Sequence, residues 1–510
     1  MSGDVRERDR AHSLKGARTN FLTLVGQTTF FLFSAAAARL FGQALWGAYT
    51  TAYAWIDVLV RTAVMAGDKG VLIFVPARRA QGDEAGAVRA VASTLRLAIV
   101  ASIVLALGMV GASFIVERVS GEPLDGQAMR LLSPVVVMSA IAMLLLASTM
   151  AAKVLHYNFL AKGVTEPVVM FVAAVILGTT LPSMGGLALA PLLTGAVVLA
   201  VAVWAVGQVF VRRDILASLR RDPIDREMVR FVLPLAASEL INILAVRLGS
   251  FILIAYVVVE DRAVFNTCLL LAGTVSYVRG TFDTVLAPIA AEAWAQQDHE
   301  RLAVNLQHQT RIVLLVAIPF ASLFIVGGPA ILALYGEGFA SGHRTLMWIA
   351  IAHLVNATLG LASWVLMAAR MSRSMLINNI IKLALNVGLS VLLIPYLGIE
   401  GAALATMVAI TTQLSIQVWE VWKLCGVHPF SPRLAQIAIL GVVTLGAELL
   451  AYGLAPGTPV VRALGVLAVG TPLYALVARR WREKPLPPRA GGAAGAGGAG
   501  AGRADPPATE

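Results

Sequence analysis

Two pairs of opposite charges stand four residues apart in stretches that are otherwise apolar. Asp57 and Arg61 form one pair, and Arg279 and Asp283 form the other. Residues four apart share one face of a helix, so each pair can neutralise itself or present its charges together to a ligand. A charge in the middle of a membrane-spanning helix costs at least about 2.5–3.5 kcal/mol and persists where it has a partner or faces water. These residues are therefore candidates for substrate binding, ion coupling or internal charge pairing.

Cations, acids and amides gather in two further apolar stretches. They are Glu239, Asn242 and Arg247 within 230–256, and Asn378, Asn379 and Lys382 within 374–396. An arginine fork binds phosphate through two parallel hydrogen bonds, and amides pair with hydroxyl groups. We therefore expect a basic, amide-lined site for an anionic, sugar-bearing substrate. Its expected binding residues are Arg61, Arg247, Arg279, Lys382, Asn378 and Asn379.

The acids have two possible roles. Asp57, Glu239 and Asp283, with the amide of Asn242, can couple transport to an ion or can pair with buried cations. Glu239 and Asn242 are three residues apart and so share a helix face, which suits a carboxylate-plus-amide cage for H⁺ or Na⁺. The alternative for Glu239 is a structural ion pair, for instance with Arg247 two turns further along.

The elements that carry these residues are expected to be membrane-spanning helices. The chain is 58% hydrophobic and 14% charged, against roughly 45–50% and 25% in soluble proteins, and its mean hydropathy is +0.79. This composition excludes a soluble enzyme, a secreted disulfide scaffold and a disordered chain. About 20 apolar residues cross a bilayer as a helix. The sequence predicts an all-α polytopic protein with fourteen spans, at about 19–41, 46–66, 90–115, 129–152, 160–181, 187–211, 230–256, 264–289, 305–327, 344–369, 374–396, 400–423, 434–454 and 459–479.

Basic residues predict the orientation of these spans. With the N-terminus in the cytoplasm, 29 of the 40 Lys and Arg residues fall in cytoplasmic segments, 5 in the opposite loops and 6 within spans. This asymmetry indicates that both termini are cytoplasmic. It also explains most of the formal charge of +11, because basic loops attract anionic lipid heads. We therefore expect no nucleic-acid partner.

The chain also repeats itself. A shift of 216 residues aligns 47–88 with 263–304, and a shift of 213 aligns 181–185 with 394–398. A repeat with an even number of spans gives two halves of the same orientation, as in transporters whose substrate site lies between the halves. The predicted divisions are a basic cytoplasmic tail (1–18), a six-helix lobe (19–211), a cytoplasmic linker (212–229), a second six-helix lobe (230–423), two appended helices (434–479) and a disordered Gly/Ala/Pro-rich tail (485–510).

No pattern of catalytic residues stands out. The seven histidines are scattered, and the two cysteines, Cys268 and Cys425, are far apart and supply no metal-ligand spacing. No zinc-protease, nucleophile-elbow or phosphate-loop motif is present. The sequence therefore predicts that the protein is not an enzyme and that it uses neither a cofactor nor a metal.

Four short segments stand out: Phe41-Gly-Gln-Ala-Leu-Trp-Gly-Ala-Tyr49, Ala66-Gly-Asp-Lys-Gly-Val-Leu-Ile-Phe-Val-Pro76, Arg230-Phe-Val-Leu-Pro234 and Leu393-Ile-Pro-Tyr-Leu-Gly-Ile-Glu-Gly-Ala-Ala403. They resemble the polysaccharide (O-antigen type) flippases of the multidrug/oligosaccharidyl-lipid/polysaccharide exporter superfamily. The resemblance runs over about 15–425, and that family has fourteen spans in two six-helix lobes plus two. One departure is that family members often carry an acid beside the arginine of the seventh span. Here Val246 and Leu248 flank Arg247, so no acid stands beside it. If an acid of this span couples transport to an ion, the residue must be Glu239.

The resemblance implies transport of an undecaprenyl-diphosphate-linked oligosaccharide across the bacterial inner membrane by alternating access. Its implied partners are the lipid-linked substrate and membrane lipids, with polysaccharide polymerase and other envelope-assembly proteins as candidates. Three alternatives stay open: a lipid II flippase, a cation-coupled multidrug antiporter of the same superfamily, and a non-transporting scaffold of an envelope-assembly complex. The excess of cations over acids within the spans disfavours export of a cationic drug.

Overall fold

The structure is a computed structural model of the 510-residue chain. It describes residues 29–152, 154, 156–369, 371–454 and parts of 456–474. The described residues form helices and short connections and contain no strand, which confirms the predicted all-α class. The predicted tails 1–18 and 485–510, the start of the first predicted span and most of the last lie outside the described residues.

The first half of the chain begins with a helix at Thr29–Phe41. It continues through α2 (Gln43–Val64), α3 (Gly67–Ala80), α4 (Glu84–Ser120), α5 (Pro123–Ala151), α6 (His156–Asn158), the π-helix η1 (Phe159–Thr165), α7 (Glu166–Thr180), α8 (Met184–Val209) and α9 (Arg212–Arg221). The second half contains α10 (Arg226–Ile252), η2 (Leu253–Ala255), α11 (Val259–Gly273), α12 (Val275–Ala295), α13 (His299–Ile325), α14 (Gly328–Ala333), η3 (Glu337–Gly342), α15 (His343–Leu359), α16 (Ala362–Ala368), α17 (Ser372–Cys425) and α18 (Pro432–Leu454).

Within the described residues, eight helices are long and apolar enough to cross a membrane, or nine if the bent α15–α16 pair is one span. The prediction was fourteen. One of the eight, α17, contains two predicted spans, because Gly398 has φ 55° and ψ −131° and turns the chain between them. The predicted spans 46–66 and 264–289 correspond to helices that break, at Met65–Ala66 and at Thr274. These are the spans that carry the paired charges, which also lower their hydropathy.

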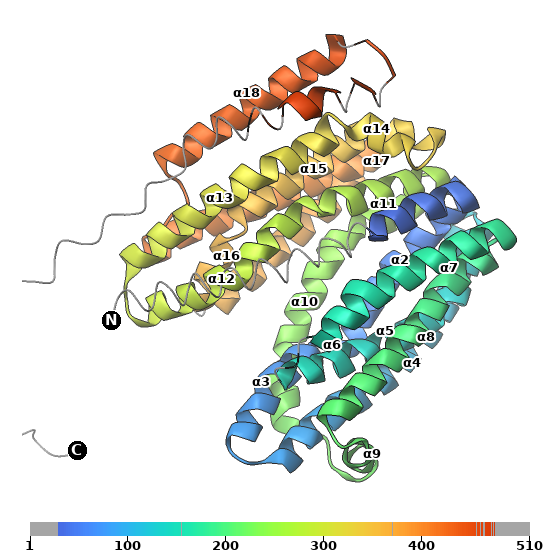
Figure 1. Cartoon of the computed structure of the whole chain (residues 1–510), viewed down its shortest axis with the longest axis vertical. Coiled ribbons are helices and arrows are strands. Elements are labelled where there is room, and N and C mark those ends of the chain that lie inside the picture. The colour runs from blue at the N-terminus through green and yellow to red at the C-terminus, as the bar shows by residue number, and fades with distance from the viewer. Residues whose placement is uncertain are drawn as a thin grey trace, which may run out of the picture.

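The helices pack in two groups (Figure 1). In one group α4 and α8 pack against α5, α2 lies across α4 and α5, and α7 packs on α8. In the other, α15 and α10 pack against α17, while α12 and α13 pack against each other and against α15. Helix α18 lies outside the second group, against α13.

The two groups meet where α2 lies beside α11 and α10 (Figure 1). Helix α2 begins at Gln43 and α11 at Val259, which is the repeat distance of 216. Asn266 of α11 donates a hydrogen bond of 3.3 Å to Thr50 of α2, and these two residues are also 216 apart. A two-fold axis between the halves brings equivalent positions into contact in this way.

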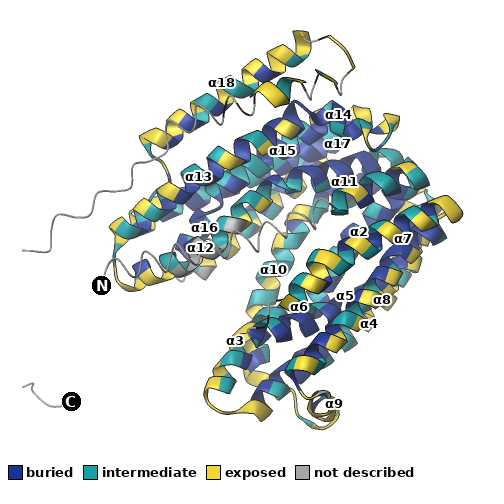
Figure 2. Cartoon of the chain, viewed as in Figure 1, coloured by how far each residue is buried: buried dark blue, intermediate teal, exposed yellow. Residues whose placement is uncertain are grey.

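Burial follows this arrangement (Figure 2). The core runs through both groups and across the α2–α11 contact, and it includes Trp46, Phe265 and Leu361. Outward-facing residues of α4 and α18 are apolar and exposed, for example Leu107 and Val442. An apolar exterior around a packed interior is expected for helices surrounded by lipid.

Candidate substrate-binding site

Three of the charged residues predicted from the sequence meet where the two groups face each other. Arg247 of α10 donates to Asp57 Oδ2 of α2 through Nε (3.1 Å) and Nη2 (2.9 Å). Arg61 Nε lies 3.5 Å from Asp57 Oδ1. One carboxylate therefore holds two guanidinium groups, one from its own helix and one from the other half of the chain. The pairing of Asp57 with Arg61 inside one helix is only part of the arrangement.

Glu239 forms an ion pair with Lys69 of α3. It does not contact Arg247, so the partner suggested for it from the sequence is wrong. Lys69 was assigned to a cytoplasmic loop, but the chain continues there as α3, which packs against α10. Asn242, the expected companion of Glu239, instead accepts a hydrogen bond of 2.7 Å from Lys382.

Helix α17 supplies the amides and one buried cation. Lys382 is buried and reaches α10 through Asn242. Asn378 is buried and donates to Glu420 Oε2 at 2.6 Å, so it joins the two halves of α17. Asn379 is half-buried, and among the described residues it has no hydrogen-bond partner. Lys382 therefore lies at the contact between α17 and α10, whereas Asn378 joins the two parts of α17 to each other.

Arg279 lies in a separate polar cluster inside the second group. Its Nε is 3.3 Å from Asp283 Oδ2, and its Nη1 donates to Asn356 Oδ1 at 2.8 Å. Trp364 donates to the other oxygen of Asp283 at 2.7 Å. A Cβ at Gly360 would lie 2.1 Å from Arg279 Nη1, so a side chain at this bend would displace the guanidinium from its present position.

The balance of charge in these clusters is positive. The charged residues and their ionic partners comprise five cations, Arg61, Lys69, Arg247, Arg279 and Lys382, and three acids, Asp57, Glu239 and Asp283. Arg61, Arg247 and Asp57 keep 45%, 30% and 27% of their side chains exposed. A charge within a membrane-spanning helix persists where it has a partner or faces water, and these three side chains are paired with one another and partly accessible.

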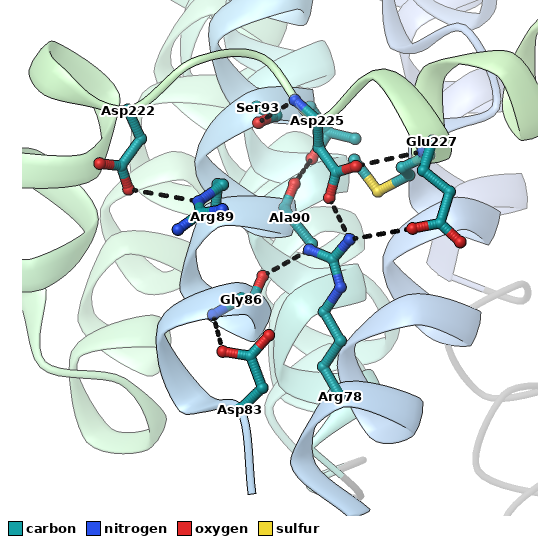
Figure 3. A network of polar contacts seen from close by, with 11 residues as sticks. Arg78, Asp83, Gly86, Arg89, Ala90, Ser93, Asp222, Asp225 and Glu227 are labelled. Carbon is teal, nitrogen blue, oxygen red and sulfur yellow. Dashed lines mark hydrogen bonds and ion pairs between the residues drawn. The ribbon is translucent and has the colours of Figure 1, made fainter. Parts of the chain in front are cut away.

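At one end of the molecule, polar contacts fasten the start of α10 to the first group (Figure 3). Asp225 caps α10 by accepting from Met228 N, and its carboxylate lies 2.5 Å from Arg78 of α3. Asp225 N donates to Ser93 Oγ of α4 at 3.1 Å. Helix α10 thus begins on α3 and α4 and continues along α17, so it bridges the two groups.

At the other end, an ion pair joins the groups directly. Asp125 of α5 and Arg262 of α11 are 2.8 Å apart, and each side chain is 1% exposed. Among the described residues, Asp125 Oδ1 and Arg262 Nε and Nη2 have no hydrogen-bond partner. Arg39 also crosses here, donating to the carbonyl oxygens of Leu334 and Ala333. The groups are therefore held closed at this end by charged and polar contacts.

The sequence matches the family model described as polysaccharide biosynthesis protein over residues 37–342, which is more than half of the chain. The chain belongs to this family. The match confirms the resemblance to the polysaccharide flippases. A comparison with curated proteins finds no match.

Solved structures similar to this polysaccharide biosynthesis protein are transporters of the MOP superfamily. An inward-facing multidrug resistance MATE family transporter is 16% identical, with a TM-score of 0.68 over 79% of this chain and 98% of that one. The lipid II flippase MurJ, in an inward closed conformation, is 11% identical, with a TM-score of 0.72 over 91% and 99%. A MOP superfamily transporter from Pyrococcus furiosus is 16% identical, with a TM-score of 0.60 over 80% and 95%. The protein is thus a multi-pass membrane protein with the MOP transporter fold.

Several residues of this family member were not found from the sequence. Lys69 was missed because the low hydropathy around it indicated a loop, although Glu239 is its partner. Asp125 and Arg262 were missed because each lies near the start of a helix, where a charge is unremarkable. Trp364 gave no signal, because an apolar side chain with one donor is ordinary in a membrane helix. Only the three-dimensional contacts single these residues out.

Proposed function

We propose that the protein transports an anionic lipid-linked oligosaccharide, of the undecaprenyl-diphosphate type, from the cytoplasmic to the outer leaflet of the bacterial inner membrane. The family supports a role in polysaccharide biosynthesis, and the fold supports transport. The observation that carries the proposal is the position of Asp57 between Arg61 and Arg247, at the contact between the two halves.

A diphosphate can compete with Asp57 for these guanidinium groups. Each phosphate offers oxygens spaced like those of a carboxylate and binds an arginine fork in the same bidentate way. When the head group binds Arg247 and Arg61, the ion pair between α2 and α10 opens. Substrate binding and separation of the halves are then the same event.

The charge balance suits such a head group. With Glu420 beside Asn378 included, the site and its neighbouring clusters hold five cations and four acids, an excess of one positive charge. The amide of Asn242 and the half-buried Asn379 are available to sugar hydroxyl groups beside these cations. The polyprenyl chain remains in the lipid that surrounds the apolar exterior.

Transport would proceed by rocking of two lobes, 19–211 and 230–423, about the α2–α11 contact. In the state described, Asp125 and Arg262 join the lobes at one end. The predicted orientation makes this end the outer one, so opening of this pair would let the substrate leave outward. The clamp between Arg78 and Asp225 keeps α10 attached to both lobes as they move.

Moving two negative charges outward is favourable when the membrane is negative inside, by about 2.3 kcal/mol per charge per 100 mV. The loaded step therefore does not require a coupled ion. Glu239, paired with Lys69 across the two groups, is the residue we propose for resetting the empty carrier with H⁺ or Na⁺.

The proposal is tested by the profile of lipid-linked sugars in cells from which the protein is removed. We expect an undecaprenyl-diphosphate-linked oligosaccharide to accumulate, and the wild-type protein, but not the Arg247→Ala variant, to restore its export. Accumulation of lipid II instead would assign the protein to peptidoglycan synthesis. An unchanged profile together with a lost drug resistance would favour a multidrug antiporter.

A further inference from the structure

An apolar groove of about 500 Å³ opens beside the C-terminal end of α17. Its walls come from the end of α15, the last turns of α17 and the loop that leads to α18. They include Leu359, Ser415, Trp419, Trp422, His428 and Phe430, and none of the lining residues is an acid. Trp422 and Phe430 are 58% and 54% exposed, so the described part of the chain leaves large aromatic surfaces uncovered.

A cation and an unpaired nitrogen lie at this groove. Lys423 Nζ is 4.8 Å from the centre of the Trp419 ring, which holds the ammonium group against the groove wall. The Nδ1 atom of His428 is shielded from solvent and has no hydrogen-bond partner in the described part of the chain. The ring of His428 is otherwise stacked near Phe430. The groove thus combines an apolar body with polar groups suited to an anion.

We propose that this groove binds an anionic phospholipid of the surrounding bilayer. Its acyl chain would lie along Trp419, Trp422 and Phe430, and its phosphate would contact Lys423. Aromatic side chains concentrate at the boundary between hydrocarbon and head groups, and basic groups there attract anionic lipids. The absence of an acid from the groove lining favours an anionic over a zwitterionic head group. This inference depends on membrane insertion and is independent of the transported substrate.

The groove lies behind the bend that holds Arg279. Leu359 lines the groove, and the next residue, Gly360, packs against the Arg279 guanidinium on the other side. Helices α15 and α16 meet here at 43°. A lipid chain in the groove therefore supports the same bend that positions Asn356 and Gly360 around Arg279.

The test uses brominated lipids, which quench the fluorescence of tryptophans that they touch. The full chain is reconstituted in vesicles containing brominated phosphatidylglycerol or brominated phosphatidylcholine. The fluorescence that comes from the groove is the difference between the fluorescence of the wild type and that of the double variant Trp419→Phe, Trp422→Phe. We expect phosphatidylglycerol to quench this signal at lower mole fraction than phosphatidylcholine. Lys423→Gln should remove that preference, about fivefold for one basic residue near the surface.

A matched control is Arg213→Gln, which removes an exposed cation on α9 in the other half of the chain and should leave the preference intact. Ser415→Phe fills the groove from an exposed position without adding a tryptophan and should reduce quenching by both lipids. Equal quenching by the two lipids, or full quenching in the Ser415→Phe variant, would overturn the proposal. Quenching by a brominated polyprenyl phosphate but not by phosphatidylglycerol would also overturn it and assign the groove to a lipid carrier.

Discussion

The ion pair between Asp125 and Arg262 should control which end of the transporter is open. It joins α5 to α11, and both side chains are 1% exposed. The Asp125→Asn variant removes one charge and leaves Arg262 buried without an anionic partner. Opening of the two halves at this end returns Arg262 to water. The variant should therefore populate a state that is open at this end, while each half keeps its own packing.

The magnitude follows from the burial of the pair. Removing one partner of a buried ion pair costs about 3–5 kcal/mol, because the remaining charge is uncompensated. At about 1.4 kcal/mol per factor of ten, the ratio of closed to open protein should fall by roughly two to three and a half orders of magnitude. A shift of that size turns a minor open state into the dominant one.

Electron–electron distance measurements between spin labels report this change. Labels at Gln127 and Val258, which are exposed near the pair and belong to different halves, should move apart in the Asp125→Asn variant. The double variant Asp125→Leu, Arg262→Met removes both charges, and apolar replacement of a buried pair is often neutral or stabilising. It should restore the short distance.

The chain supplies a matched control at the same end. Glu117 and Arg130 form an ion pair of 3.0 Å between α4 and α5, within one half and about one-third exposed. Glu117→Gln should leave the label distance unchanged. An Asp125→Asn variant with the wild-type distance distribution would refute the view that this pair holds the two halves together.

Three further predictions concern the site and the tail. Arg279→Lys should transport poorly, because an ammonium cannot replace the fork that contacts both Asp283 and Asn356, and the loss should appear in transport rate at unchanged membrane content. Glu239→Gln should abolish any response of transport to an imposed pH or Na⁺ gradient in reconstituted vesicles, and a response equal to that of the parent would leave Glu239 as a structural partner of Lys69. Deletion of 485–510 should leave membrane insertion and transport intact, because a segment made mostly of glycine, alanine and proline has little to bury, and export assays of the truncated protein check this.

Many of the helices could be predicted because a helix that spans the membrane needs a continuous apolar stretch of about 20 residues, which the local sequence reveals. The break between Leu181 and Gly186 separates α7 from α8 as expected, with Ser183 capping α8. The repeat distance of 216 reappears in the contact between Thr50 and Asn266. Hydropathy alone failed where charge interrupts a helix, so α3 was predicted as a loop.

The pairing within the site could not be predicted, because it depends on which helices meet across the two halves. The positions of Asp57, Arg247 and Lys382 in the sequence predict that each needs a partner or water. They do not predict that Asp57 holds Arg247, or that Lys382 reaches Asn242. Those choices depend on the rotation of α10 between α2 and α17, which is set by packing over the whole length of the helix.

The most direct test of the account is translocation by the purified protein. Vesicles containing the wild type and a fluorescent undecaprenyl-diphosphate-linked oligosaccharide are treated with a membrane-impermeant quencher, which separates the two leaflets. Wild-type protein should make the whole label accessible with time. Arg247→Ala should not, whereas Arg344→Ala, a control whose side chain is 71% exposed beside Glu400, should behave as the wild type. Translocation by Arg247→Ala at the wild-type rate would contradict the account.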